Sequence, residues 1–171
     1  VQGIMRRGMT PGALKKFMME QGPSKNTNLM EWDKLWAYNK SIIDPVCPRY
    51  SAIVKETVAK LTITNGPKAN EKRTQDLHPK NKDVGTKDVI FGQNLYIEAG
   101  DAKDIEIGEK ITLMKWGNAK VTGKSEKGGV IELTAEVDEA DTDFKKTKKL
   151  HWMSVDKSNF EATLVAVSYT H

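Results

Sequence analysis

The sequence has few of the residues on which many enzymes and secreted proteins depend. One cysteine among 171 residues cannot form a disulfide within the chain, and the histidines at 78, 151 and 171 have no zinc-binding spacing. No apolar run approaches the ~18 residues that cross a bilayer, and no signal-peptide pattern is present. These absences favour a reducing, cytoplasmic location and give no reason to expect a membrane partner.

Catalytic patterns are also missing. No Ser or Cys stands beside a base and an orienting acid at a suggestive spacing, and we expect Cys47 to fill space in the core. The acidic stretch EVDEADTD (136–143) lacks the spacing and the glycine of a calcium loop, so a solvated loop is favoured. We therefore expect no catalytic residue, metal site or cofactor site within this chain.

What the chain does have is a core-forming composition and a mild excess of positive charge. Hydrophobic residues make up 38% and the net charge is +4, which is compatible with nucleic-acid binding. Each basic cluster taken alone is better explained as a solvated face, whereas several clusters beside exposed rings would suit RNA. The clusters are Arg6 and Arg7, Lys15 and Lys16, Lys25, Lys80, Lys82 and Lys87, and Lys145, Lys146, Lys148 and Lys149.

The pattern predicts a helical lead followed by a β-barrel. Residues 1–45 have helical periodicity, while from Tyr50 apolar and polar residues alternate, apart from a long polar loop at 65–88. We predict a mainly β fold, with a short α-helical segment (1–45) and an antiparallel β-barrel (46–171). The helix signals are Thr10-Pro11, Gly22-Pro23, a capping box of Asn28 and Glu31, and Pro45; the expected strands lie in 50–63, 88–98, 109–123, 129–137, 149–155 and 161–170.

Both ends of the chain read as internal. It opens on VQGIMRRG without an initiator Met and closes inside an expected strand, which indicates a piece of a longer protein.

One ring is open to two interpretations: Trp116, just before the turn-forming pair Gly117-Asn118, could stack on a base or plug one end of the barrel.

Several motifs resemble cytosolic, eukaryote-type glutamyl-tRNA synthetases. They occur in the order and at the spacing found in that family, and the resemblance extends over the whole chain. The motifs are MEWDK (30–34), IIDPVCPRY (42–50), HPKNKDVGTKDVIFGQNLYIEAGDA (78–102), LMKWGNA (113–119) and KKTKKLHWMSV (145–155). The stretch is similar to the join between the catalytic and anticodon-binding parts of those enzymes.

The resemblance implies a ligase that joins glutamate to its tRNA using ATP and magnesium, with the catalytic signatures of the HIGH and KMSKS type lying upstream of this segment. This chain should then be inactive alone and should contact glutamate tRNA. Its helical part would lie against the inner face of the tRNA and its barrel, with the second barrel truncated, would hold the anticodon. Other synthetases in an assembly are a second class of partner.

The resemblance also suggests tRNA-binding residues. Pro48-Arg49 matches a pair in glutaminyl-tRNA synthetases whose arginine contacts the middle anticodon base. Arginines that read the other two bases there align with Asp104, Thr112 and Met114, so those readers are missing here. We nominate Arg49, Trp116, Asn118, Lys25, Arg6 and Arg7 as tRNA-binding residues. The alternatives are an RNA-binding barrel related to a ribosomal protein that binds ribosomal RNA, the same region of a bifunctional synthetase, and a purely structural docking module.

Overall fold

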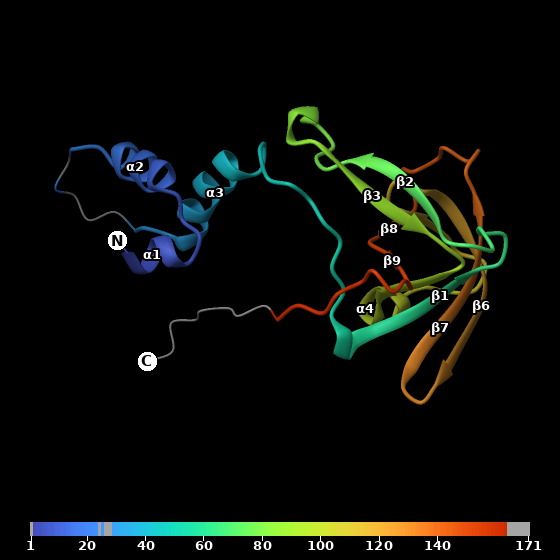
Figure 1. Ribbon diagram of the computed structural model, residues 1–171. Coiled ribbons are helices and arrows are strands. Elements are labelled where there is room, and N and C mark those ends of the chain that lie inside the picture. Colours follow the sequence, from blue (N-terminus) through green and yellow to red (C-terminus); the bar gives the residue numbers. More distant parts are fainter. Residues whose placement is uncertain (1, 24, 26–28, 164–171) are drawn as a thin grey trace. The chain divides into compact units, whose positions relative to one another are not determined.

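The computed structural model describes residues 2–23, 25 and 29–163 of the chain. Its contacts divide the chain into two units (Figure 1). The helical unit contains the residues up to Arg49 and residues 76–86; the barrel unit contains Tyr50–Gln75 and Lys87–Glu161. The elements are α1 (Gln2–Arg6), α2 (Pro11–Glu20), α3 (Trp32–Ile43), η1 (Lys55–Thr57), β1 (Val58–Ile63), β2 (Glu71–Asp76), η2 (Lys82–Val84), β3 (Thr86–Phe91), β4 (Asn94–Glu98), α4 (Ala99–Lys103), β5 (Lys110–Leu113), β6 (Gly117–Lys127), β7 (Val130–Asp138), β8 (Lys148–Leu150) and β9 (Met153–Ser154).

The helical unit is held by a small core and one buried amide. Met9, Ala13, Phe17 and Leu35 are buried together where α2 packs on α3. Asn39 of α3 accepts a hydrogen bond from the backbone N–H of Thr10 at 2.9 Å and donates one to the carbonyl of Gly8 at 2.9 Å. The Thr10 hydroxyl in turn caps α2 by accepting from Ala13 N at 3.2 Å, as its place before Pro11 predicts. A single amide thus anchors the start of α2 to α3.

The barrel unit is built around a seven-stranded sheet in the order β8-β5-β6-β7-β1-β4-β9. The pairs β1–β4, β4–β9, β5–β6 and β6–β7 are antiparallel, and β1–β7 and β5–β8 are parallel. The prediction of a mainly β, barrel-like fold is therefore confirmed, with two parallel pairs that an alternating pattern alone does not reveal.

The sheet is strongly curled. β8 and β9 occupy opposite edges of the sheet, yet only His151 and Trp152 separate them in the chain. Three residue steps span at most ~11 Å, so the two edges must approach each other closely. Figure 1 shows the sheet wrapping around itself in this way. Trp152 is thereby placed where the curled sheet comes nearest to closing.

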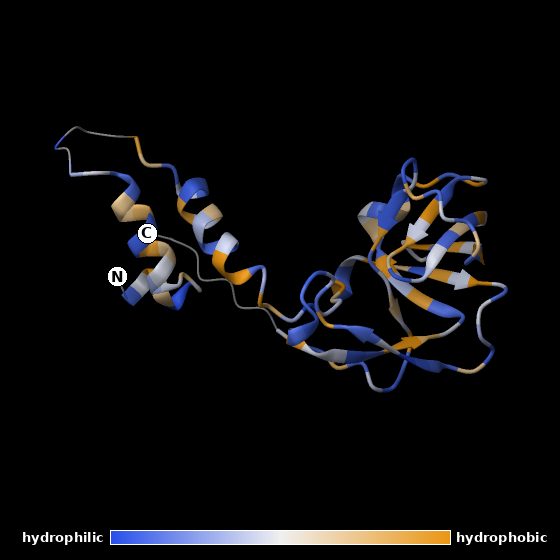
Figure 2. Cartoon of the chain, turned by 90° about the horizontal axis from the view of Figure 1, so that it is seen from above, coloured by the Kyte–Doolittle hydropathy of each residue, from blue (hydrophilic) through white to orange (hydrophobic). Residues whose placement is uncertain are grey.

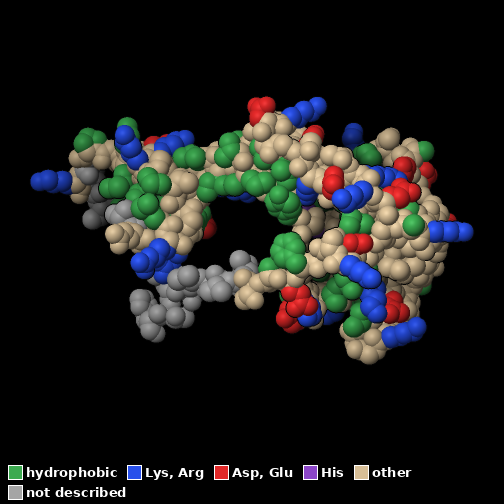
Figure 3. Space-filling model, viewed as in Figure 1, with side chains coloured by type: hydrophobic (Ala, Val, Ile, Leu, Met, Phe, Trp, Pro, Cys, Tyr) green, Lys and Arg blue, Asp and Glu red, His purple; other side chains and the backbone are tan. Residues whose placement is uncertain are grey.

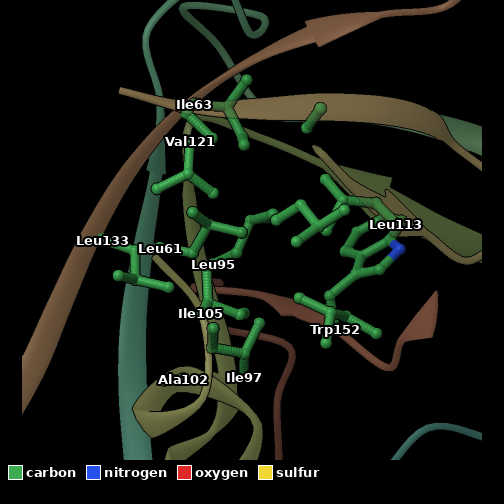
Figure 4. Packing of buried hydrophobic residues seen from close by; sticks show 14 of the residues in the cluster. Leu61, Ile63, Leu95, Ile97, Ala102, Ile105, Leu113, Val121, Leu133 and Trp152 are labelled. Atoms are coloured by element: carbon green, nitrogen blue, oxygen red, sulfur yellow. The ribbon is translucent and has the colours of Figure 1, made fainter. Parts of the chain in front are cut away.

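Alternation along the strands fills the interior. β1 reads Val58–Ile63 with its second, fourth and sixth residues buried, and Figure 2 shows hydrophobic and hydrophilic residues along these strands. In Figure 4, side chains from several strands and from α4 point toward one another. The residues labelled there are Leu61, Ile63, Leu95, Ile97, Ala102, Ile105, Leu113, Val121, Leu133 and Trp152, all buried members of one core.

The prediction of a long loop at 65–88 was wrong. It contains β2, the short helix η2 and the start of β3, and β2 pairs with β3 in a separate two-stranded sheet. The strand signal is absent because this hairpin is joined by polar contacts on its surface: Lys72 lies 3.4 Å from a carboxylate oxygen of Asp88, and the Thr74 hydroxyl donates to Asp88 at 3.1 Å. A strand without an apolar face has no two-residue hydrophobic period.

Two further boundaries differ from the prediction. α3 begins at Trp32 with Glu31 as its N-cap and no side-chain cap, three residues later than the capping box indicated; Asn28 lies outside the described residues. The strand expected at 161–170 is not formed at 161–163, and the rest lies outside the described residues. The stops at Gly22 and Pro45 are confirmed, since α2 ends at Glu20 and α3 at Ile43.

Candidate nucleic-acid interface

Three aromatic rings pack together at one end of the barrel unit. The Trp116 ring lies 4.8 Å from Phe91 and 4.9 Å from Trp152, and Phe91 lies 5.1 Å from Trp152, measured between ring centroids. Trp152 also donates from its indole nitrogen to the carbonyl of Met114 at 2.9 Å. This aromatic stack fixes the β5–β6 turn to the barrel, because ring pairs and an indole hydrogen bond act on the same few residues.

Trp116 and Asn118, both nominated as tRNA contacts, are buried. Trp116 is 9% exposed and its indole nitrogen donates to Glu139 at 3.0 Å. Asn118 is 1% exposed, accepts from the Thr112 hydroxyl at 2.6 Å and donates to the carbonyl of Asp143 at 3.1 Å. Of the two interpretations of Trp116, its burial agrees with a ring that plugs one end of the barrel. Direct base contact by either residue stays a prediction.

The β5–β6 turn itself has an unusual backbone. Lys115 has a φ of +63°, the one positive φ among the non-glycine residues that the structure describes. This conformation costs a non-glycine residue roughly 1–2 kcal/mol and is found most often where surrounding contacts enforce it. Here Trp116 N donates to Leu113 O at 2.9 Å, and the amide of Gln75 donates to Lys115 O at 3.4 Å. Lys115 is exposed at the tip of a turn whose shape is imposed on it.

An exposed tyrosine and a second lysine belong to the same surface as Lys115. Tyr50 is 72% exposed, and the ammonium of Lys87 lies 5.3 Å from the centroid of its ring, within cation–π range. Partial burial lowers the pKa of Lys87, and the positive charge of Lys115 lowers it further. Tyr50, Gln75, Lys87 and Lys115 therefore form one cationic, ring-bearing patch, which we call the turn surface.

A polar pocket of about 320 Å³ is lined in part by Trp116 and Arg73. The Arg73 guanidinium stacks 4.4 Å from the Phe91 centroid and pairs with Glu139 at 3.2 Å and Glu71 at 3.4 Å. Arg73 and Gln75 are two residues apart on β2 and so project to one face of that strand. The pocket is lined by Asn65, Gly66, Pro67, Glu71, Arg73, Trp116, Val137 and Glu139.

The other four nominated residues belong to the helical unit. Arg49 is half-exposed; its guanidinium pairs with Asp44 at 2.7 Å and its backbone N–H donates to Leu77 O at 3.0 Å. Lys25 and Arg6 are exposed, while Arg7 is partly buried and donates to Gly3 O at 2.8 Å. Arg49 is thus the most firmly positioned of these cations. Figure 3 shows Lys and Arg side chains on both units, mixed with Asp and Glu on the barrel unit.

Sequence reasoning missed residues whose positions depend on the fold. Arg73 and Gln75 lie in the segment predicted to be a loop, and Tyr50 was noted only as the residue where the alternation of apolar and polar residues begins. His78, assigned to a polar loop, is buried: its Nδ1 accepts from the backbone of Lys80 at 3.1 Å and of Asn81 at 2.9 Å. These positions follow from the fold, and the local sequence contains no signal for them.

The acidic stretch at 136–143 uses its carboxylates as turn caps. Asp138 accepts from Ala140 N and Asp141 from Asp143 N, both at 3.0 Å. Lys110 donates to Asp141 at 2.8 Å. Among the residues that the structure describes, no three His, Cys, Asp or Glu side chains are grouped so that they could hold a metal ion.

Asp141 gives a testable pH dependence. The hydrogen bond from the Lys110 side chain, followed by that from the Asp143 backbone, lowers the pKa of Asp141. A carboxylate whose folded pKa lies below its unfolded value of ~3.9 stabilises the fold above that value, and the contribution disappears as the pH falls through the folded pKa. Asp141→Asn should therefore lower the urea midpoint at pH 7 and differ less from the parent near pH 2. Glu126→Gln, at an exposed carboxylate of β6, is the control; an equal deficit at both pH values would contradict the assignment.

A curled sheet with a rigid turn, an exposed ring and adjacent cations has the features of a domain that binds unpaired RNA nucleotides. Comparison with known families agrees. Residues 47–138 match the family described as "tRNA synthetases class I (E and Q), anti-codon binding domain". The chain belongs to this family of anticodon-binding domains, as the sequence motifs predicted.

The curated relatives are ligases. The cytoplasmic glutamate–tRNA ligase of Arabidopsis thaliana is 44% identical over 99% of this chain, and the probable cytoplasmic glutamate–tRNA ligase of Schizosaccharomyces pombe is 42% identical over 99%. The bifunctional glutamate/proline–tRNA ligase of Mus musculus is 39% identical over 100%. This chain spans 24%, 24% and 11% of their respective lengths.

In the part of the chain that the structure describes, no helix is long and apolar enough to span a membrane.

Proposed function

We propose that this chain is the tRNA-binding region of a glutamate–tRNA ligase and that it contacts the anticodon of glutamate tRNA. The observation that carries the proposal is the family match over 47–138, which begins just before Arg49 and includes the β5–β6 turn. The names of the relatives support glutamate as the amino acid and the cytoplasm as the location. ATP, magnesium and glutamate would be bound by parts of the ligase outside this chain.

The chain supplies two kinds of contact to such an RNA. Lys and Arg side chains neutralise phosphates, which gives affinity without sequence preference. Arginine forks and amides bind base edges, which gives specificity worth about 1–3 kcal/mol for each good pair by analogy with other base readout. A residue that binds a base edge should already be ordered before the RNA binds. Arg49 meets this requirement, since its backbone N–H donates to Leu77 O and its side chain pairs with Asp44.

The same region of a bifunctional ligase is a second candidate, because the glutamate/proline–tRNA ligases of mouse and of Drosophila melanogaster are 39% and 42% identical to this chain. In such a parent, the region would also lie within a larger synthetase assembly. The family match over 47–138 favours the synthetase over the ribosomal-RNA alternative.

The proposal predicts anticodon-dependent, salt-sensitive RNA binding. An RNA hairpin with the anticodon stem and loop of a glutamate tRNA should bind the chain at low salt. The logarithm of the binding constant should fall linearly with the logarithm of the salt concentration, with a slope of about 0.7 for each phosphate contacted in single-stranded RNA. Fluorescence anisotropy over a salt series measures this slope. A hairpin with the same stem and a changed anticodon is the control.

Footprinting on bulk RNA gives the complementary result. Protection of the anticodon loop of glutamate tRNA is the expected outcome, because the base contacts lie there. Protection of ribosomal RNA alone, or an affinity that does not change with salt, would overturn the proposal in favour of the ribosomal or the structural alternative.

A further inference from the structure

The turn surface combines an exposed aromatic ring with two lysine side chains. Tyr50 leaves most of its ring in solvent, so hydrophobic burial contributes little to holding it. Lys87 nevertheless lies against the ring, and the charge of Lys115 is close enough to affect Lys87. Because like charges disfavour each other, an anion that binds beside these two side chains is favoured.

The β5–β6 turn within this surface is held in one backbone conformation. The Lys115 backbone is held at a positive φ by the Gln75 amide and by the turn hydrogen bond of Trp116. Behind the turn, the indole of Trp152 donates to Met114 O and all three rings of the aromatic stack pack together. A ligand that binds here therefore loses little free energy to ordering the backbone.

We propose that Tyr50 is a stacking platform for one unstacked base of the bound RNA and that Lys87 and Lys115 bind the phosphates beside that base. This inference rests on the proposed function, and it assigns base stacking to Tyr50 in place of the buried Trp116. With Lys87 over one face of the ring, the base stacks on the other. Stacking accepts any base, so this contact gives affinity and positions the loop.

The chemistry favours RNA over an acidic protein segment. Carboxylates could pair with Lys87 and Lys115 but would offer no ring to stack on Tyr50, whereas a nucleotide carries both a phosphate and a flat aromatic base. The 72% exposure of Tyr50 also makes its variants suitable for testing, since removing an exposed ring leaves no cavity in the core.

The test measures binding of the anticodon hairpin to the 171-residue chain and its variants at fixed salt. Tyr50→Ala should weaken binding on the order of 10- to 100-fold, because stacking on an aromatic side chain has that value per base. Tyr50→Phe keeps the ring and should bind within about twofold of the parent. Equal weakening by Tyr50→Phe and Tyr50→Ala would overturn the stacking assignment, since it would mean that the hydroxyl makes the contact.

A double-mutant cycle with the RNA identifies the base. Removing the base that stacks on Tyr50 should weaken binding to the parent but have little effect on Tyr50→Ala, whereas removing any other loop base should affect both proteins equally. Additive losses at every position would overturn the proposal.

The cations are tested by salt dependence. Lys87→Gln and Lys115→Gln should each reduce the steepness of the salt dependence by ~0.7, while Lys127→Gln, at the far end of β6 from the turn, should leave it unchanged. Equal slopes for all three variants would contradict the phosphate contacts.

If the parent chain fails to bind the hairpin at low salt, the proposed function fails. If the parent binds and Tyr50→Ala binds equally well, this inference alone fails.

Discussion

Replacing Trp152 by alanine is expected to lower the free energy of unfolding of the barrel unit by about 3–5 kcal/mol, the usual cost of removing a large buried aromatic side chain. Trp152 is buried, contacts both other rings of the aromatic stack and donates to Met114 O. The substitution removes all of these contacts at the point where β8 and β9, the two edges of the sheet, are joined by only two residues.

Urea unfolding followed by near-ultraviolet circular dichroism measures this effect. Phe160→Ala is the control: Phe160 is an aromatic residue of the same unit that is 87% exposed, and its removal should change the free energy of unfolding by no more than about 0.5 kcal/mol. An unchanged midpoint for Trp152→Ala would mean that the aromatic stack does not hold the edges of the sheet together. Because the same ring fixes the β5–β6 turn, the variant should also bind the anticodon hairpin more weakly.

Replacing Arg49 by alanine should reduce discrimination at the middle anticodon base by about 1–3 kcal/mol in a glutamate–tRNA ligase that contains this chain. The physical reason is the loss of base-edge hydrogen bonds from a guanidinium that Asp44 already orients. Stability should change little, because an exposed ion pair contributes ~0–1 kcal/mol. The effect is therefore separable from misfolding.

The measurement is kcat/KM for charging the cognate tRNA and a tRNA with a changed middle base, together with the rate of amino-acid activation. Activation should be unaffected, since we propose that it takes place in parts of the ligase outside this chain. Arg49→Lys keeps the charge but not the guanidinium fork, so it should lose most of the discrimination and little of the affinity. If the parent and Arg49→Ala ligases discriminate equally between the two tRNAs, Arg49 does not read that base.

The helical unit was predictable where its signals are local. Thr10 before Pro11 and Gly22 after α2 act through hydrogen bonds and φ angles of the residues themselves, so they are visible in the sequence. The start of α3 was misplaced because Asn28 and Glu31 have the spacing of a capping box, yet the structure uses Glu31 as the N-cap with no side-chain hydrogen bond. A spacing permits a cap but does not enforce one.

The candidate site was harder to predict. Trp116 could stack on a base or fill the barrel, and only the positions of Phe91 and Trp152 decide between these, since both rings come from other parts of the chain. Tyr50 and Lys87 likewise become neighbours only through the fold. Sequence patterns carry no information about which distant residues meet, except through a resemblance to known proteins.

The sequence by itself determined the β-rich class, the helical lead, the Thr10 cap of α2, the stops of α2 and α3 and the family, because periodicity, turn chemistry and extended motifs are properties of neighbouring residues. The tertiary structure decided that two strand pairs are parallel, that Trp116 and Asn118 are buried, and that Tyr50, Lys87 and Lys115 share one exposed surface. Those facts depend on how a curled sheet brings its strands and turns together, and the side-chain alternation along any one strand is the same whichever strands become its neighbours.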